Sequence, residues 1–154
     1  MIASFVVDTK IGVIEVVYQN DQISRIILDC KKSISPELNP FEEMIRAQLE
    51  SYFGDASYQL SLAVALIGTK HQKAVWTKML EIPCGSVMTY GDIAKLIGSS
   101  GQAVGNACRN NPIPIIVPCH RVVAANAIGG FSGATEGALV KIKQVLLAHE
   151  GVHY

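Results

Sequence analysis

The segment 115–123, IIVPCHRVV, places a cysteine and a histidine side by side among β-branched apolar residues. Such residues are typical of a buried strand, and a free cysteine in that setting is usually an inert packing residue. Histidine, however, titrates near neutral pH and can generate the thiolate that acts as a nucleophile. Two interpretations follow: a core strand, or a reactive thiol beside its own base.

For Cys119 and His120 to cooperate, the chain must turn between them or a water must bridge them. Neighbouring side chains of a regular strand point to opposite faces, so the two groups could not touch directly in a strand. Pro118 has no N–H to donate and favours a departure from a strand ladder. A catalytic histidine is normally oriented by a third group, often a carboxylate, which the dipeptide alone does not identify.

The segment HEGVH, residues 149–153, matches the HExxH pattern of zinc proteases. Gly151 weakens a helix there, and no chain follows that could supply a third zinc ligand. The cysteines lie at positions 30, 84, 108 and 119. Their wide spacing, without a CxxC pair, indicates thiols in a reducing compartment. We therefore expect neither a metal site nor a disulfide framework, and Glu150 needs another role.

The composition is that of one folded domain or two small ones. Of the 154 residues, 49% are apolar and 17% are charged, which excludes a disordered chain. No apolar run approaches the ~20 residues that span a bilayer. Asp8 interrupts the N-terminus too early for a secretory signal. We therefore expect an intracellular, cytoplasmic protein without a membrane partner.

The first 68 residues predict a small sheet and one helix. Segments rich in Val and Ile predict strands at 4–8, 12–18 and 23–28, and a further short strand is expected at 58–62. Segment 41–53 carries apolar residues at helical spacing and ends at Gly54. This half holds five basic and nine acidic residues, a formal charge of −4.

The remaining residues, 69–154, predict mainly helices, at 71–80, 90–97, 102–109 and 139–149. Thr89 is the expected N-cap of the second helix, and the last one is expected to place Leu139, Ile142, Leu146 and His149 on one face.

The helices at 90–97 and 102–109, joined by a glycine-containing turn, look like a helix-turn-helix. The small residues of the second, QAVGNACR, suit either close helix packing or a low-profile surface in a nucleic-acid groove. Eight basic and four acidic residues give this half a charge of +4. That charge fits a polyanionic partner, and it equally fits an ordinary, modestly charged surface.

Several motifs together resemble one family, the O6-alkylguanine-DNA alkyltransferases, also called methylated-DNA–protein-cysteine methyltransferases. IVPCHRVV resembles its active-site motif, and IPCGSVMTYGDIA resembles the stretch leading into its first DNA-binding helix. AVGNACRNNPIPIIVPCHRVV is similar to its recognition helix and active-site strand, and LLAHEG to its closing helix. In the N-terminal half, QLESYFGD followed by GTKHQKAVW has a counterpart. The resemblance is strong over residues 68–151.

The resemblance implies a direct DNA repair reaction. Cys119 would accept an alkyl group from O6-alkylguanine, with O4-alkylthymine as a second candidate lesion, in a single turnover that inactivates the protein. His120 would act as base through a water, and Glu150 would orient it. Tyr90 would help rotate the nucleotide and deliver a proton to the departing guanine. Asn111 would tie the recognition helix to the active-site turn.

The resemblance also implies a partner, a fold and an organisation. Duplex DNA would be contacted through its minor groove by a monomer, without a cofactor. The fold would be α/β, with a small N-terminal ribonuclease-H-like strand-and-helix domain (1–68) and a mostly helical, winged helix-turn-helix-like domain (69–154). The DNA-contacting residues would be Gln102, Ala103, Arg109 and Ala125, and the base pocket would be lined by Val122, Phe131 and Ser132.

The chain departs from the family pattern in a few places. Gln102 stands where much of the family has an arginine that fills the gap left by the flipped base. Family members often have an aromatic residue at the positions of His71, Cys84 and Val145, and the stretch FSGATEGALVK is a few residues longer than usual.

Two rival functions remain open at this point. A non-enzymatic relative that only recognises alkylated guanine would lack the acceptor cysteine, which is present here. A cysteine hydrolase with a Cys-His-Glu triad would turn over ester or peptide substrates.

Overall fold

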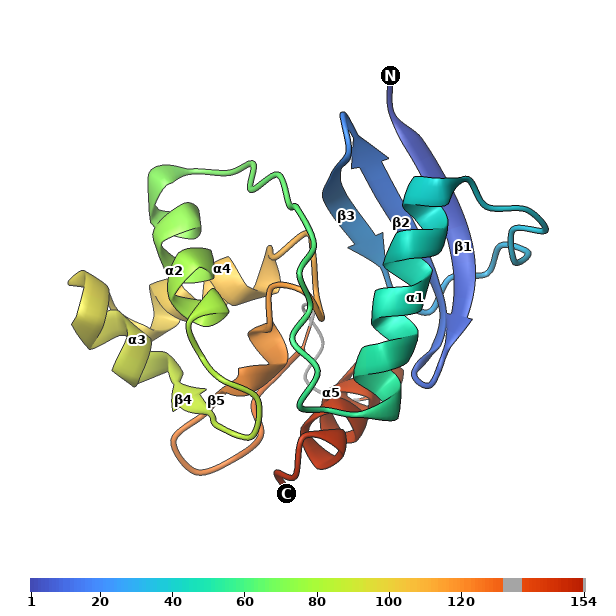
Figure 1. Ribbon diagram of the computed structural model, residues 1–154. Helices are drawn as coiled ribbons and strands as arrows, with labels where there is room; N and C mark the ends of the chain where they lie inside the picture. Colours follow the sequence, from blue (N-terminus) through green and yellow to red (C-terminus); the bar gives the residue numbers. More distant parts are fainter. Residues whose placement is uncertain (132–136, 154) are drawn as a thin grey trace. The chain divides into compact units, whose positions relative to one another are not determined.

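The computed structural model describes residues 1–131 and 137–153, and the chain divides into two compact units, Met1–Leu66 and Ile67–Tyr154 (Figure 1). The first unit contains a three-stranded antiparallel sheet, in which β2 (Gly12–Gln19) lies between β1 (Ala3–Thr9) and β3 (Gln22–Ile27). The tight turn between β2 and β3 has Asn20 and Asp21 at φ 52° and 58°, the left-handed pair that a two-residue hairpin loop requires.

Helix α1 (Pro40–Gly54) packs against β1 and completes the first unit. Asn39 caps it with a capping box: its side chain accepts a hydrogen bond from the Glu42 backbone, while the Glu42 side chain accepts one from the Asn39 backbone. Ile45 and Leu49 point into the core of this unit and are almost fully buried. The predicted helix and first three strands are thus present, with ends shifted by at most one residue.

The strand predicted at 58–62 is wrong. The chain instead forms an isolated β-bridge just after this segment, where Val64 pairs with Ile23 of β3. The backbone of Ser61 bonds to a side chain instead: its N–H donates to the Gln48 amide oxygen at 2.8 Å, and its carbonyl accepts from the same amide at 3.2 Å. Because these backbone groups are satisfied by α1, no strand ladder forms here.

The second unit is mainly helical. Helices α2 (Lys70–Leu80), α3 (Tyr90–Ile97) and α4 (Gly101–Arg109) pack together, and α5 (Ala138–His149) contacts the turn η1 (Cys119–Arg121). Two short parallel strands, β4 (Met88–Thr89) and β5 (Val122–Val123), join the segments before α3 and after η1. The mixed α/β class expected from the sequence is confirmed by this arrangement and by the solved structures described below.

A buried hydrogen bond ties α2 to α4. The Trp76 indole N–H donates to the Ala107 carbonyl at 2.9 Å, and Trp76 is 1% exposed. Thr89 caps α3 through a capping box with Asp92, as predicted. Helix α4 is capped by Ser100, whose side chain accepts a hydrogen bond from the Ala103 backbone.

Helix α5 carries the residues expected on one face at helical spacing, but its most buried side chains are displaced from that face. Val140, Lys143, Leu146 and Leu147 are the buried residues of α5, whereas Leu139, Ile142 and His149 are only half-buried. The physical reason is that Lys143 turns inward and finds backbone acceptors, so the buried face includes a charge that an apolar pattern does not show.

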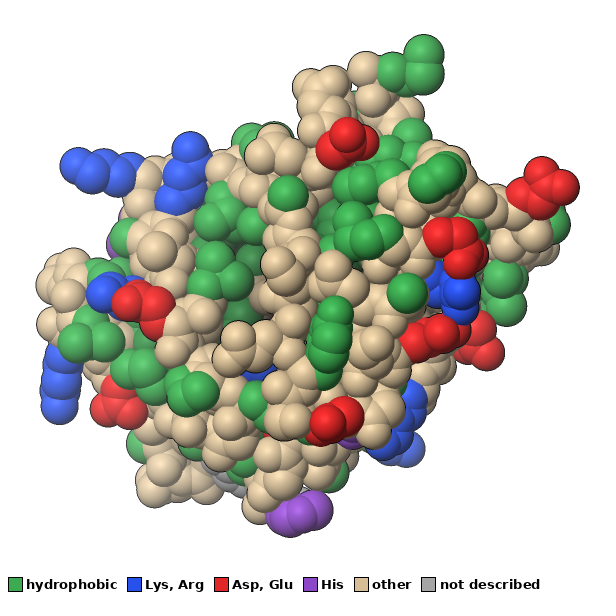
Figure 2. All heavy atoms as spheres, in the orientation of Figure 1, with side chains coloured by type: hydrophobic (Ala, Val, Ile, Leu, Met, Phe, Trp, Pro, Cys, Tyr) green, Lys and Arg blue, Asp and Glu red, His purple; other side chains and the backbone are tan. Residues whose placement is uncertain are grey.

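The surface carries no strong segregation of charge in the view of Figure 2, where basic and acidic side chains are interspersed with apolar ones. None of the helices within residues 1–131 and 137–153 is long and apolar enough to cross a membrane.

Candidate active site

The chain turns at Pro118, so Cys119 and His120 do not lie in a strand. Pro118 has φ −82° and ψ 68°, and the Cys119 N–H donates to the Val117 carbonyl at 2.8 Å, which is an inverse γ-turn. The single 3-10 turn of η1 follows directly. The sequence IIVPCHRVV is therefore a buried segment, a turn that carries the two reactive side chains, and then strand β5.

Asn111 holds this turn from the end of α4. Its side-chain N–H donates to the Val117 carbonyl at 2.8 Å, and its side-chain oxygen accepts from the Ile113 N–H at 3.0 Å. Between these contacts Ile115 has φ 75°, a left-handed conformation that costs a β-branched residue roughly 1–3 kcal/mol. The segment leading to Cys119 is thus strained and fixed at both sides by one amide.

His120 forms a buried pair with Glu150, which follows α5. Nε2 of His120 lies 2.9 Å from Oε2 of Glu150, and both side chains are fully buried. Because a carboxylate only accepts hydrogen bonds, Nε2 carries the hydrogen, and the lone pair of neutral His120 is on Nδ1. Nδ1 is buried and has no hydrogen-bond partner within the described residues.

Burial keeps both Cys119 and His120 neutral. It lowers the pKa of His120, an effect that outweighs the opposing influence of Glu150. Burial likewise raises the pKa of the Cys119 thiol to about 11, while a hydrogen bond from Asn111 and the charge of Lys143 act to lower it. At neutral pH Cys119 is therefore a thiol that needs a base before it can attack, and His120 is a neutral base.

Tyr90, the first residue of α3, lies beside the same turn. Burial raises the pKa of its phenol to about 12, with further contributions from the nearby Cys108 and Cys119 thiols, while a hydrogen bond from the Gly130 backbone acts in the opposite direction. Tyr90 consequently stays protonated at neutral pH and can donate a hydrogen bond or a proton.

Lys143 of α5 also belongs to the site, and its side chain is fully buried. Its ammonium donates to the carbonyls of Val122 at 2.7 Å and Gly130 at 2.9 Å, which joins β5 to the loop before Phe131. Burial lowers the pKa of Lys143 to about 8, and the Cys119 and Cys108 thiols act in the opposite direction.

The structure brings together five of the residues expected in the site: Cys119, His120, Glu150 and Asn111 around the turn, and Tyr90 beside it. Two of the expected pocket residues, Val122 and Phe131, are buried, and Ser132 lies outside the described residues. The expected DNA-contacting residues lie at the surface: Gln102, Arg109 and Ala125 are exposed, and Ala103 is half-buried.

Sequence reasoning missed two residues of the site, Arg121 and Lys143. Arg121 binds both carboxylate oxygens of Glu150, although the PCHR motif already placed it next to His120. Lys143 lies three residues after Val140 and three before Leu146, so its helical position was the available signal for burial.

In the HEGVH segment, Glu150 has other partners than a metal. Glu150 is held by His120 and Arg121, and no group of three or more potential metal ligands occurs in the described parts of the chain.

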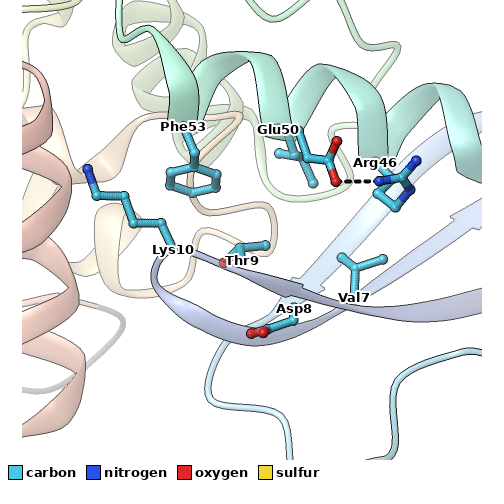
Figure 3. Close-up of a pocket in the computed structure, with 8 residues that line it drawn as sticks. Val7, Asp8, Thr9, Lys10, Arg46, Glu50 and Phe53 are labelled. Carbon is cyan, nitrogen blue, oxygen red and sulfur yellow. Dashed lines mark hydrogen bonds and ion pairs between the residues drawn. The ribbon is translucent and has the colours of Figure 1, made fainter.

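The first unit also contains a pocket, of about 240 Å³, lined by β1 and α1 (Figure 3). Val7, Leu49 and Phe53 supply its apolar wall, and Arg46 is paired with Glu43 and Glu50 along α1. Because that guanidinium is already paired along its own helix, the pocket offers no clear set of reactive groups. The chemistry of the chain is concentrated around Cys119.

Comparison with known proteins finds relatives that match most of the chain. A family model described as "6-O-methylguanine DNA methyltransferase, DNA binding domain" matches residues 70–152. A probable methylated-DNA–protein-cysteine methyltransferase of Acanthamoeba polyphaga mimivirus is 42% identical over 140 residues, covering 87% of this chain and 90% of the relative. The methylated-DNA–protein-cysteine methyltransferase of Methanosarcina acetivorans is 47% identical over 113 residues, 72% of this chain and 69% of the relative.

Solved structures give the same result. The O6-methylguanine methyltransferase of Mycobacterium tuberculosis superposes with a TM-score of 0.81 at 30% identity, covering 97% of this chain and 93% of that one. The crystal structure titled as Mycobacterium tuberculosis OGT in complex with DNA has a TM-score of 0.79 at 30% identity, over 96% and 92% of the two chains.

Proposed function

Because the chain belongs to the 6-O-methylguanine DNA methyltransferase family, whose members move an alkyl group from DNA to a protein cysteine, we propose that Cys119 is the acceptor. The observation that carries this assignment is a buried thiol on the turn held by Asn111, next to His120, which forms a buried pair with Glu150. Cys84, by contrast, is exposed, and Cys108 packs with its sulfur 3.7 Å from that of Met79.

The proposed reaction uses the two nitrogens of His120 differently. Nε2 donates to Glu150, so Nδ1 is free to accept the Cys119 proton through one bridging water. The resulting thiolate attacks the alkyl carbon, a sulfur–carbon bond forms, and the bond from that carbon to O6 of guanine breaks. Guanine leaves with the electron pair and takes up a proton, so that the thiol proton is replaced overall by the alkyl group.

Tyr90 is the proposed proton donor to the departing guanine. Its raised pKa of about 12 keeps the phenol protonated until the leaving group gains negative charge. The stable thioether cannot be hydrolysed by the site, so each molecule reacts once. No diffusible cofactor takes part in these steps.

The proposed partner is duplex DNA that contains O6-alkylguanine, with O4-alkylthymine as a second substrate. A base edge inside a duplex is out of reach, so the nucleotide must be extruded before Cys119 can attack. We assign the minor-groove surface to α4, where Gln102 and Arg109 are exposed and the small Ala103 permits close approach, and to Ala125. Val122 and Phe131, together with Ser132, are the proposed pocket for the extruded base.

The finer points of the fold and setting belong to the same proposal. The packed α3–α4 pair and the short β4–β5 sheet support a winged helix-turn-helix-like domain over 69–154. The small sheet with α1 supports a ribonuclease-H-like domain over 1–68. A monomeric state and a cytoplasmic location remain predictions.

Intact-mass measurement tests the function directly. After incubation with a duplex containing O6-methylguanine, the protein should gain one methyl group per molecule, and peptide mapping should place it on Cys119. Cys119→Ser should gain none, whereas Cys84→Ser, which removes an exposed thiol, should react like the unmodified chain. Repeated turnover, or a methyl group on another cysteine, would contradict the proposal and turn attention to hydrolase chemistry.

A further inference from the structure

Arg121 is a charged side chain at the site to which the proposed reaction gives no task, and it binds the same carboxylate as His120. Its Nε donates to Oε1 of Glu150 at 2.8 Å, and its Nη2 donates to Oε2 at 2.9 Å. Oε2 also accepts the hydrogen bond from Nε2 of His120, at 2.9 Å. One carboxylate oxygen is therefore shared between the proposed base and the guanidinium.

The third guanidinium nitrogen of Arg121 binds a segment that lies outside both η1 and α5. Its Nη1 donates to the Ile82 carbonyl at 2.7 Å, just after α2. Arg121 itself ends η1, and Glu150 follows α5. The guanidinium thus joins three segments that are distant in the sequence, and its planar fork fits a carboxylate in one orientation, which the point charge of a lysine does not enforce.

The charge of Arg121 acts on both members of the pair. A two-bond contact with a cation favours the carboxylate form of Glu150 over the neutral acid. The same cation disfavours a second positive charge on His120: burial is the main reason that the pKa of His120 is lowered, and Arg121 adds to it, against the influence of Glu150.

We propose that Arg121 is a positioning residue for alkyl transfer: it holds Glu150 as an oriented carboxylate, so that the proton leaving Cys119 comes to rest on His120 and does not pass on to Glu150. This inference rests on the proposed function, because it takes Cys119 as the nucleophile and His120 as its base. During the reaction His120 gains one proton at Nδ1 and becomes an imidazolium, while Nε2–H continues to donate to an unprotonated Oε2.

The test compares Arg121→Met and Arg121→Lys in single-turnover methyl transfer across a pH series. Without the cation, protonated His120 becomes easier to form, so Arg121→Met should move the pH of half-maximal rate upward by about one unit, the shift typical of one close charge. Arg121→Lys keeps the cation and should retain the midpoint of the unmodified chain. Its maximal rate should nevertheless fall by about tenfold or more, because a misplaced catalytic group is costly.

Lys141→Met is the matched control for the loss of one positive charge. Lys141 is exposed on α5 and is not one of its buried residues, so this variant should keep both the midpoint and the maximal rate. An equal loss of rate at every pH in Arg121→Met, without a shift, would show a purely structural role and overturn the proposal. An unchanged maximal rate in Arg121→Lys would overturn it as well.

A measurement on the unsubstituted chain covers the case in which Arg121→Met does not fold. The carboxyl carbon of Glu150, followed by NMR in ¹³C-labelled protein, should show no protonation over the pH range in which the transfer rate falls. Titration of Glu150 together with the rate would place the proton on the carboxylate and overturn the inference. Failure of the proposed function is distinguishable, because it appears as the absence of a methyl group on Cys119 in the mass measurement.

Discussion

At the scale of single residues, Cys119 combines low exposure with the need to react. Burial raises the pKa of its thiol to about 11 and lowers that of His120, so neither group is charged at neutral pH and no buried thiolate–imidazolium pair must be maintained before DNA binds. A thiol held in this form is a poor target for oxidants, which attack thiolates. The thiolate is then formed only when proton transfer through His120 accompanies attack on the substrate.

Glu150→Gln should slow alkyl transfer by an order of magnitude or more and leave DNA affinity nearly unchanged. Glutamine is neutral and stabilises protonated His120 less well, and general acid–base assistance contributes ~10²–10⁴-fold. Stopped-time quench assays measure the rate of alkyl transfer, and binding to undamaged duplex measures DNA affinity. Thermal melting shows how much stability is lost with the Arg121 contact. Glu81→Gln, an exposed acid paired with Lys78, is the control. An unaltered transfer rate would reduce Glu150 to a helix-end charge.

Gly129→Ala should displace Tyr90 and slow transfer. A Cβ at this position would lie 2.8 Å from the Tyr90 hydroxyl and 3.2 Å from the Ala124 backbone nitrogen, on a backbone with φ 79°. The left-handed backbone alone costs an alanine roughly 1–2 kcal/mol.

Gly137→Ala separates the steric displacement of Tyr90 from the backbone strain, because Gly137 has φ 89° but no atom of the described residues within 4 Å of an added Cβ. Single-turnover rates should fall in Gly129→Ala well below those of Gly137→Ala at similar thermal stability. Equal rates in the two variants would mean that the position of Tyr90 does not limit the reaction.

At the scale of elements, the sequence predicted those whose signals are local. Thr89 was identified as the cap of α3, and α1, α2 and α4 were placed within one residue at each end. The left-handed conformation of Ile115 carries no local signal. The helical position of Lys143 indicates burial but not the backbone carbonyls that it binds, because those partners are brought together by the fold. For the same reason the Cys119–His120–Glu150 grouping came from a family resemblance, and the contacts of Arg121 came only from the structure.

Gln102→Arg should strengthen binding to duplex DNA and raise the rate of repair of the duplex. Gln102 is exposed at the start of this helix, and an added cation there would increase the salt slope of binding by about one unit. A longer, charged side chain would also fill the space of the extruded base better, which favours the flipped state by a few kcal/mol at most.

The measurement is single-turnover repair of duplex O6-methylguanine beside reaction with the free base O6-benzylguanine, which needs no flipping. The variant should accelerate the first and barely change the second. Asn106→Arg, one turn further along the exposed face of α4, controls for added charge alone and should raise the salt slope without the same gain in rate. Equal acceleration on both substrates would locate the effect of Gln102 in the thiol chemistry.

At the scale of the whole molecule, the two compact units differ in what they contribute. Every residue proposed for the reaction belongs to Ile67–Tyr154, and so does Trp76, the single tryptophan of the chain. Trp76 is 1% exposed and bonded to α4, so its fluorescence reports the integrity of the unit that carries Cys119. Unfolding of that unit can therefore be followed separately from changes in the sheet unit.

The unit that carries Cys119 should lose stability as the pH falls below about 6.5. The pKa of His120 is lowered in the folded chain, so the unfolded chain binds its proton first, and the free energy of unfolding falls by up to about 1.4 kcal/mol per pH unit in this range. Cys119 and Lys143 titrate only at higher pH, with values of about 11 and about 8. The pKa of Asp92 is also lowered, but from 3.8, so its effect begins well below this window.

Urea unfolding followed by Trp76 fluorescence at about pH 7.5 and about pH 5.5 measures this difference directly. His120→Gln, which keeps a side-chain N–H for Glu150, should be less stable than the unmodified chain near neutral pH but should show little change between the two pH values. A variant that loses as much stability on acidification as the unmodified chain would assign the effect to other groups. The pKa of His120 would then be similar in the folded and unfolded chains, contrary to the lowering that its burial causes.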